Sequence, residues 1–378
     1  MGLINYVTRV QFGYGALTEV TSELALAGIQ RPFVVTDKGV RQLGFVEQLH
    51  RLVGEGLSGI YDETPGNPTE AAVRAAVAQF TTNKSDGLIA IGGGSAIDLA
   101  KAVAVAAAHT GPLSTFAAIE GGIDKITRAT FPMIAIPTTS GTGSEVGRGA
   151  IIILDDGRKV ALLSPFLIPK AAICDPELSL SLPAKLTAAT GMDAISHCIE
   201  TYLAPSFNPP ADGIALEGLK RAWSNIARAT LEPGNRAARL NMSIAATMGA
   251  MAFQKGLGCV HSLSHALGGL NPRLHHGTLN AIFMPTVLRF NRTAETAVAE
   301  GKYSRLAAAM GLSSEDEVVT ALEHLTTSIG LPSKLSELGV ERSDFDYIVQ
   351  GALRDHSHKT NPREASADQY RDMLEQSY

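Results

Sequence analysis

The chain has 378 residues, of which 45% are hydrophobic and 18% are charged, with a formal net charge of −5 and a pI of about 6.1. This length and composition indicate two well-packed globular domains rather than a disordered chain. The slightly negative net charge does not suggest a nucleic-acid-binding surface. No apolar run reaches the roughly eighteen residues needed to span a membrane.

The N-terminal segment MGLINYVTRV has no charged stretch followed by an apolar one, so we expect no secretory signal and a cytoplasmic location. Three widely spaced cysteines, Cys174, Cys198 and Cys259, fit a reducing compartment better than a disulfide framework. Cys198 and Cys259 adjoin histidine-rich segments, but burial as small apolar side chains is favoured over a role as ligands.

The first half of the chain alternates β-branched runs with helical patterns. Residues 31–39 (RPFVVTDKG) predict a strand and a turn, residues 87–108 a strand, a glycine turn and a helix, and residues 131–145 a strand entering a polar loop. Strands that alternate with helices of this length indicate parallel βαβ units with a covered sheet.

After about residue 180 the pattern becomes helical, and no convincing strand follows. Apolar residues recur at helical spacing in the segments 183–203, 211–231, 236–253 and 315–330. Pro183 suits the first turn of a new helix. We therefore predict an α/β nucleotide-type domain over residues 1–180 and an all-helical domain over residues 181–378, with a cleft between them.

Two loops and one aspartate in the first half could hold a nucleotide. In IGGGSAIDLAK (residues 91–101), consecutive glycines before a helix let a phosphate approach the backbone, with Ser95 as cap or donor; a structural turn is the alternative. The loop PTTSGTGSE (residues 137–145) follows a strand, where open α/β sheets place ligands, although it could be a plain solvated loop. Asp37 ends the strand FVVTD and could bind an adenosine ribose, or could belong to a simple turn.

The second half carries a concentration of potential metal ligands. Asp193 and His197 are four residues apart on a predicted helix, and His261 and His265 repeat that spacing. Either pair alone would more often form a hydrogen bond on a helix surface than bind a metal ion. Both pairs together with a following HHG turn favour a site for a divalent first-row ion, while the absence of HExxH gives no support for a zinc protease.

Taken together, these segments resemble the iron-containing (group III) alcohol dehydrogenase family. The matching segments, in order along the chain, are VVTD, GNPT (residues 66–69), GGGSAIDLAK, PTTSGTGSE, DPELSLSLP, ATGMDAISHCIE, GLGCVHSLSHALGG, HHGTLNAIFMP and NPREAS (residues 361–366). The resemblance covers nearly the whole chain. It implies a Rossmann-like N-terminal domain, a helical C-terminal domain, a nicotinamide cofactor and Fe²⁺, with Zn²⁺ as the other candidate.

The resemblance also implies individual roles in the second half. Asp193, His197 and His261 match the positions of metal ligands, and His265 matches a residue near substrate and nicotinamide, which we interpret as a catalytic proton carrier. The fourth ligand of the family precedes a glycine. The family spacing leads to His275, but here the His-Gly pair is His276-Gly277. We favour His276 and a one-residue insertion in the preceding turn, because turns absorb insertions readily.

On the cofactor side, Asp37 implies NAD(H) rather than NADP(H), and Phe253 resembles a residue that lines the substrate pocket. The remaining residues assigned to cofactor binding by the resemblance are Gly93, Gly94, Ser95, Asp98, Thr138, Thr139, Ser144 and Lys159.

The resemblance implies hydride transfer between NAD(H) and a small primary alcohol or aldehyde. Arg148, which follows the second loop, could pair with a substrate carboxylate and so favour a hydroxy acid/semialdehyde pair; a surface salt bridge is the alternative reading. A dehydroquinate-synthase-like lyase would require a more basic pocket than Phe253 and its apolar neighbours suggest. Maleylacetate reductases lack the full set of ligands. The family often forms dimers or larger homo-oligomers, so we expect one here, with no nucleic-acid or membrane partner.

Overall fold

The computed structural model describes residues 8–378, which separate into two units. One unit comprises residues 8–139 and 144–179, and the other comprises residues 140–143 and 180–378. Residues 1–7, most of the segment in which we expect no secretory signal, lie outside the described residues.

The first unit is built on a six-stranded parallel sheet. Its strands lie in the order β1 (Arg9–Phe12), β8 (Ala171–Cys174), β5 (Met133–Pro137), β4 (Gly87–Gly92), β2 (Pro32–Val35) and β3 (Gly59–Tyr61). Its helices are α1 (Val20–Ala27), α2 (Lys38–Gln42), α3 (Phe45–Val53), α4 (Glu70–Thr82) and α5 (Gly94–Ala108). This is the expected α/β architecture.

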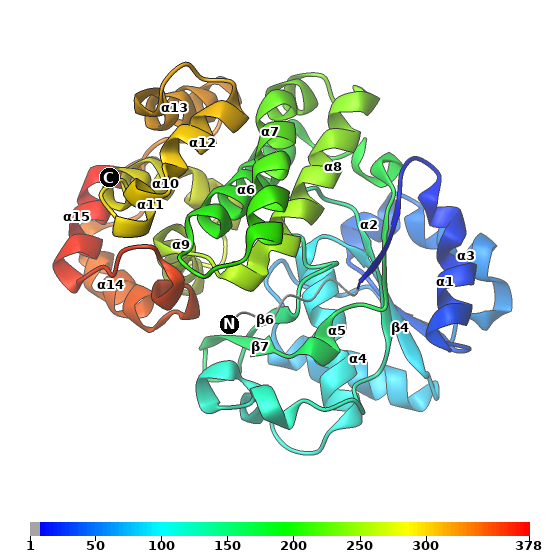
Figure 1. Cartoon of the computed structure of the whole chain (residues 1–378). Helices are drawn as coiled ribbons and strands as arrows, with labels where there is room; N and C mark the ends of the chain where they lie inside the picture. Colours follow the sequence, from blue (N-terminus) through cyan, green and yellow to red (C-terminus); the bar gives the residue numbers. More distant parts are fainter. Residues whose placement is uncertain (1–7) are drawn as a thin grey trace. The chain divides into compact units, whose positions relative to one another are not determined.

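Both faces of this sheet are covered, as a parallel sheet requires. Because side chains alternate along a strand, Val34 and Ile89 join the core under α1 and α3, whereas Phe33 and Leu88 join the core under α4 and α5. The two helix pairs flank the sheet (Figure 1). All residues of β2 and β4 are buried, which explains their continuous apolar runs.

A second, antiparallel pair of strands lies outside the main sheet. β6 (Gly149–Ile153) and β7 (Lys159–Leu163) pair over their whole length. Alternate residues of both strands are buried, and Ala150, Ile152 and Leu162 join the core of the α/β unit.

Among its described residues, the regular elements of the second unit are all helices, in keeping with the predicted fold class. Its helices are α6 (Ala184–Leu203), α7 (Pro209–Leu231), α8 (Arg236–Met251), α9 (Cys259–Leu270), α10 (His276–Asn291), α11 (Glu295–Ala299), α12 (Lys302–Met310), α13 (Val318–Ser328), α14 (Phe345–Arg354) and α15 (Ala367–Ser377). Two of its short 3-10 helices matter below, η8 (Ala252–Lys255) and η12 (His356–Thr360). Helix α6 is buried from Thr187 to Leu203 and packs against α7, α8 and α10.

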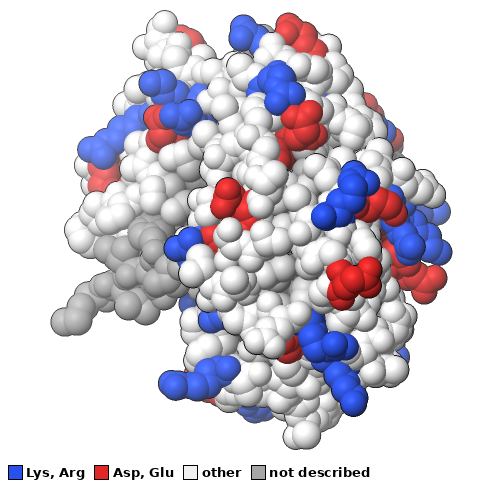
Figure 2. All heavy atoms as spheres, turned by 90° about the vertical axis from the view of Figure 1, so that its right-hand side faces the viewer, with Lys and Arg blue, Asp and Glu red and all other residues white. Residues whose placement is uncertain are grey.

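The three cysteines are buried thiols outside any disulfide. Within residues 8–378, no helix combines the length and apolarity needed to cross a membrane. On the face drawn in Figure 2, basic and acidic side chains are interspersed over a largely uncharged surface.

Candidate metal centre and cofactor-binding edge

Helix α6 buries three polar side chains along one stripe. Asp193, His197 and Glu200 follow one another at intervals of four and three residues, which places them on one face of the helix. Each is at most 5% exposed, in a helix that otherwise contributes mainly apolar residues to the core. Buried polar groups of this kind need partners, and helices α9 and α10 supply them.

Three imidazole rings converge on the carboxylate of Asp193. The Nε2 atoms of His197, His276 and His261 lie 3.4, 3.6 and 3.8 Å from its Oδ1 atom. The rings of His197 and His261 stack with centroids 4.8 Å apart. His276, the first residue of α10, is the most accessible of the four side chains at 32% exposure.

This donor set fits a divalent metal ion. Bonds of about 2.0–2.2 Å to a tetrahedral ion separate neighbouring ligand atoms by about 3.3–3.6 Å, close to the three distances to Asp193 Oδ1. Imidazole and carboxylate donors suit Fe²⁺ and Zn²⁺ alike. Burial lowers the pKa of His197 and lowers the pKa of His261 well below its usual value, which keeps both rings neutral, as ligation requires.

A second layer of hydrogen bonds surrounds the four side chains. The Asn280 Nδ2 group donates to Asp193 Oδ1 at 2.8 Å, and Asn280 Oδ1 accepts a hydrogen bond from Ser264. Glu200 Oε2 lies 2.5 Å from Nδ1 of His261. Burial raises the pKa of Glu200, an effect that the backbone N–H groups of Val260, Gly258 and His261 oppose.

His265 lies beside this cluster rather than in it. Its ring stacks on His276 at 5.2 Å, and its Nδ1 is 2.9 Å from Oδ2 of Asp355. His356 Nδ1 approaches the same Oδ2 at 3.6 Å from a half-exposed position. Burial alone would raise the pKa of Asp355, but His265 and His356 hold that pKa below its usual range. Asp355, Asn280 and Glu200 are not among the candidate residues predicted from the sequence.

Two further predictions concern neighbours of the cluster. Phe253 in η8 packs its ring edge-to-face with His197, with centroids 4.7 Å apart. His275 is exposed and precedes α10, while the adjacent His276 carries its ring to Asp193. The structure thus brings Asp193, His197, His261 and His276 together.

In the α/β unit, the predicted cofactor residues gather where the parallel strands end. A methyl group added to Gly92 would lie 3.5 Å from Oδ2 of Asp37, and one added to Gly93 would lie 3.4 Å from Cγ2 of Thr139. Thr138 donates its N–H to the carbonyl of Gly92. Gly93 caps α5, so Gly94 and Ser95 form the first turn of a helix that begins at this edge, which suits an anion.

The other predicted cofactor residues make contacts inside this unit. Ser95 Oγ donates to the carbonyl of Gly66, and Lys159 Nζ donates to Asn67. Both therefore touch the segment GNPT. Asp98 accepts hydrogen bonds from the Ser144 hydroxyl at 2.6 Å and from the Ile151 N–H at 2.9 Å, so these contacts tie its carboxylate to the loop that follows β5.

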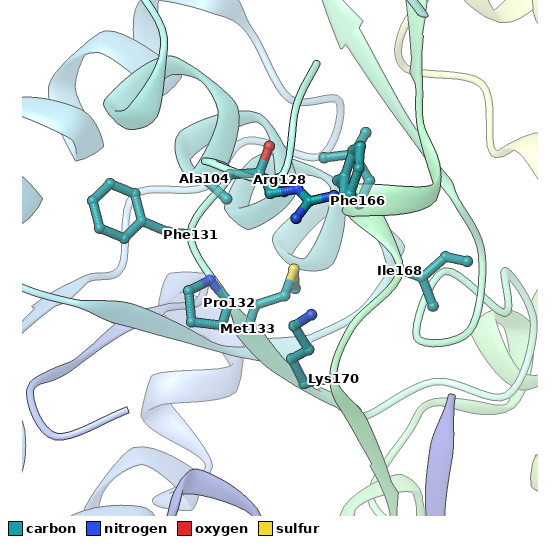
Figure 3. Close-up of a pocket in the computed structure, with 10 residues that line it drawn as sticks. Ala104, Arg128, Phe131, Pro132, Met133, Phe166, Ile168 and Lys170 are labelled. Carbon is teal, nitrogen blue, oxygen red and sulfur yellow. The ribbon is translucent and has the colours of Figure 1, made fainter. Parts of the chain in front are cut away.

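Arg148 is exposed immediately before β6. A separate pocket of about 200 Å³ lies at the amino ends of β5 and β8, and Figure 3 shows it between Arg128, Phe131, Phe166 and Lys170. None of the residues predicted from the sequence lines that pocket.

Comparison with known proteins identifies the family to which a chain with this metal-ligand cluster and these glycine-rich loops belongs. The model of the family "Iron-containing alcohol dehydrogenase" matches residues 7–176, and the model of the C-terminal Fe-containing alcohol dehydrogenase family matches residues 187–378. The chain belongs to the iron-containing alcohol dehydrogenase family. The resemblance noted in the sequence is confirmed, and this member of the family is an oxidoreductase.

Similar proteins extend over the full length of this alcohol dehydrogenase. It is 57% identical to a 4-hydroxybutyrate dehydrogenase of Cupriavidus necator over 382 aligned positions, covering 100% of both chains. A crystal structure of 1,3-propanediol oxidoreductase superimposes with a TM-score of 0.93 at 33% identity, covering 100% of both chains. The sulfoacetaldehyde reductase of Bifidobacterium kashiwanohense in complex with NAD⁺ gives a TM-score of 0.91 at 26% identity, covering 100% of this chain and 98% of the other.

Proposed function

We propose that this iron-type alcohol dehydrogenase interconverts a short ω-hydroxy acid, of the 4-hydroxybutyrate class, and its semialdehyde with NAD⁺/NADH as hydride carrier. The observation that carries the metal-dependent part is the convergence of three Nε2 atoms on Asp193 Oδ1 at 3.4–3.8 Å. The 57% identity to a 4-hydroxybutyrate dehydrogenase over the full length supports the substrate class.

In this proposal Asp193, His197, His261 and His276 hold Fe²⁺, or Zn²⁺ in its place. The chemistry expected of a bound divalent ion is Lewis-acid stabilisation of the charge that develops on the substrate oxygen. The buried imidazoles of His197 and His261, the partly exposed imidazole of His276 and the single carboxylate would hold the ion. Phe253, packed on His197, provides an apolar surface for the methylene chain of the substrate.

We propose that His265 accepts the proton that leaves the substrate hydroxyl group. Its Nδ1–H donates to Asp355, which fixes the ring orientation and leaves Nε2 available as an acceptor. His356, on the other side of the same carboxylate, is half-exposed and lies on the side of the solvent.

The cofactor residues are assigned by their place at the carboxyl ends of the strands. Gly93, Gly94 and Ser95 would cradle the pyrophosphate at the start of α5, with Asp37 on the adenosine ribose and Thr138 and Thr139 beside it. Lys159 would reach the nicotinamide ribose. Asp98 and Ser144, through their mutual hydrogen bond, would hold the loop that follows β5 in place.

Absorbance at 340 nm tests the proposal. Purified protein supplied with Fe²⁺ or Zn²⁺ and NAD⁺ should produce NADH with 4-hydroxybutyrate, with a kcat/KM at least about tenfold above that for 1-butanol. NADP⁺ should be a poor substitute. The reverse reaction should consume NADH with succinic semialdehyde.

A metal-loaded protein that turns over neither the hydroxy acid nor any simple alcohol contradicts the proposed activity. Turnover of 1-butanol or 1,3-propanediol at least as efficient as that of 4-hydroxybutyrate contradicts the substrate class alone. Size-exclusion chromatography and cell fractionation test the accompanying proposals of a homo-oligomer and a cytoplasmic location.

A further inference from the structure

Glu200 is a buried carboxylate whose hydrogen bonds converge on one short segment. Its side chain is 3% exposed on α6, one turn beyond His197. Its Oε1 atom accepts a hydrogen bond from the backbone N–H of Val260 at 2.8 Å, and its Oε2 atom lies 2.5 Å from Nδ1 of His261. Each oxygen is therefore engaged by the first turn of α9.

The first turn of α9 depends on partners from elsewhere in the chain. The residue before the helix, Gly258, has no side chain to cap it, and the N–H of Cys259 donates instead to Oδ1 of Asn361. There is no spare room around these partners. A methyl group on Gly258 would lie 2.8 Å from Glu200 Oε1 and 2.6 Å from Asn361 Oδ1, closer than real side chains approach.

The contact with Glu200 selects one tautomer of His261. The backbone N–H groups of Val260, Gly258 and His261 donate to Glu200 and favour its ionised form. Because an ionised carboxylate accepts and cannot donate, the Nδ1 atom of His261 then carries its proton toward Oε2. The Nε2 atom is then unprotonated, and it is this atom that faces Asp193 Oδ1 at 3.8 Å. The backbone contact to Val260 fixes the carboxylate itself, so the ring is held in orientation as well as in tautomer.

We infer that Glu200 is a positioning residue that holds His261 in its Nδ1–H form and thereby sets the affinity of the site for a divalent metal. This inference rests on the proposed role of His261 as a ligand. A carboxylate behind a ligating imidazole also makes the ring a better donor. Glutamine cannot replace it, because the amide has one acceptor oxygen where two acceptors are used and would turn an NH₂ group toward a donor.

Metal affinity of the apoprotein tests this role without relying on catalysis. Protein stripped with a chelator is titrated with Zn²⁺ in competition with a chromophoric chelator. Glu200→Gln should weaken Zn²⁺ binding about 10–100-fold. The matched control is Glu217→Gln on α7, an exposed carboxylate paired with Arg221, which should bind Zn²⁺ as the wild type does.

Two companion readouts separate positioning from general damage. The thermal midpoint of each apoprotein reports folding, and the visible absorption bands of the Co²⁺-substituted protein report ligand geometry. We expect Glu200→Gln to alter the Co²⁺ bands. Glu200→Asp, which keeps the charge but withdraws it from the ring, should fall between the wild type and Glu200→Gln in affinity.

Equal Zn²⁺ affinity of the wild type and folded Glu200→Gln overturns the inference, whereas a wild type that binds no Zn²⁺ contradicts the proposed metal site instead. If both Glu200 variants fail to fold, ¹⁵N NMR of the zinc-loaded wild type decides. A protonated Nδ1 on His261 supports the inference, and an unprotonated Nδ1 overturns it.

Discussion

Lys101 is fully buried in the α/β unit, and four oxygens lie within hydrogen-bonding distance of its three ammonium N–H donors. These acceptors are the carbonyl and hydroxyl oxygens of Ser144 and the carbonyl oxygens of Gly147 and Gly149. Lys101 thus pins the segment that leads from the loop after β5 into β6. Burial lowers its pKa to about 8, while Asp98 and Glu145 act to raise it.

This lowered pKa predicts a pH dependence of stability. In the unfolded chain the pKa is near 10.5, so between pH 8 and 10.5 the unfolded state binds more protons and stability must rise with pH. Below pH 8 the group is charged in both states and adds no slope. In urea denaturation, the unfolding free energy of the wild type minus that of Lys101→Met should therefore increase by about 2–3 kcal/mol from pH 8 to pH 10.5. A constant difference contradicts this assignment.

The adjacent histidines before α10 offer a matched pair of substitutions. His276→Ala should lose most bound metal, because its Nε2 is one of the atoms that face Asp193 Oδ1. His275→Ala removes an exposed side chain and should retain metal and activity. Metal content measured by atomic spectrometry after gel filtration distinguishes the two. Metal loss in His275→Ala but not in His276→Ala would reverse the assignment.

Arg148 is the residue we propose to read the charge of the substrate. Arg148→Ala should raise KM about tenfold for 4-hydroxybutyrate and leave KM for 1-butanol unchanged, since only the acid offers a charge-assisted contact. Arg128→Ala, another exposed arginine of the same unit, is the control. Equal effects of Arg148→Ala on the two substrates would remove Arg148 from the substrate site.

At the scale of elements, the proposed metal centre depends on how closely α10 approaches α6. A methyl group on Gly277 would lie 2.0 Å from the carbonyl oxygen of Ala189 and 3.1 Å from Cβ of Asp193. Glycine at this position therefore allows the start of α10, and with it His276, to reach the carboxylate. This explains in physical terms why the histidine that reaches Asp193 is the one directly before glycine.

Gly277→Ala should consequently damage folding and metal binding together. We expect a loss of about 1–3 kcal/mol in unfolding free energy from overpacking, and a weaker affinity for Zn²⁺ because two ligands shift. Gly213→Ala is the control, because a methyl group there meets no atom within 4 Å and a helical alanine is favoured over glycine. Wild-type Zn²⁺ affinity in Gly277→Ala would show that the close approach is dispensable.

The sequence predicts those parts of the site that are local in the chain. Asp193 with His197, and His261 with His265, are recognisable because spacing of four residues puts each pair on one helix face. The same rule could have found Glu200, three residues after His197, and Asn280, four residues after His276. Asp355 gives no such signal, because its partner His265 lies ninety positions away and only the fold joins them.

The strands, too, are predictable only where the local sequence carries the signal. The strands before the two glycine-rich loops are predictable from fully buried apolar runs, and they appear as β4 and β5. The strands β1 and β3 have four and three residues, too few to establish an alternating pattern. The hairpin of β6 and β7 depends on contacts with the core of the α/β unit, which the local sequence does not reveal.

For the whole molecule, removing the metal and removing NAD⁺ should each lower the thermal stability, because the two ligands are proposed to bind different units. A metal bound only by the folded helical unit stabilises it by about 4 kcal/mol at a free concentration of 1,000 times Kd, and NAD⁺ bound by the α/β unit contributes in the same way. Calorimetry should therefore show a lower unfolding temperature after chelation, and a separate rise with NAD⁺. An unfolding temperature that chelation leaves unchanged contradicts a metal bound to the folded state.

The helix that carries His261 is secured by residues far along the chain. Asp355 holds His265, Thr360 donates to the carbonyl of Leu257, and Asn361 accepts from Cys259. On a ribosome, these partners emerge roughly 10–30 s after Asp193 at ordinary elongation rates. The proposed ligand Asp193 thus leaves the ribosome well before the residues that orient the helix of His261. The proposed metal site therefore reaches its final geometry only when synthesis is nearly over.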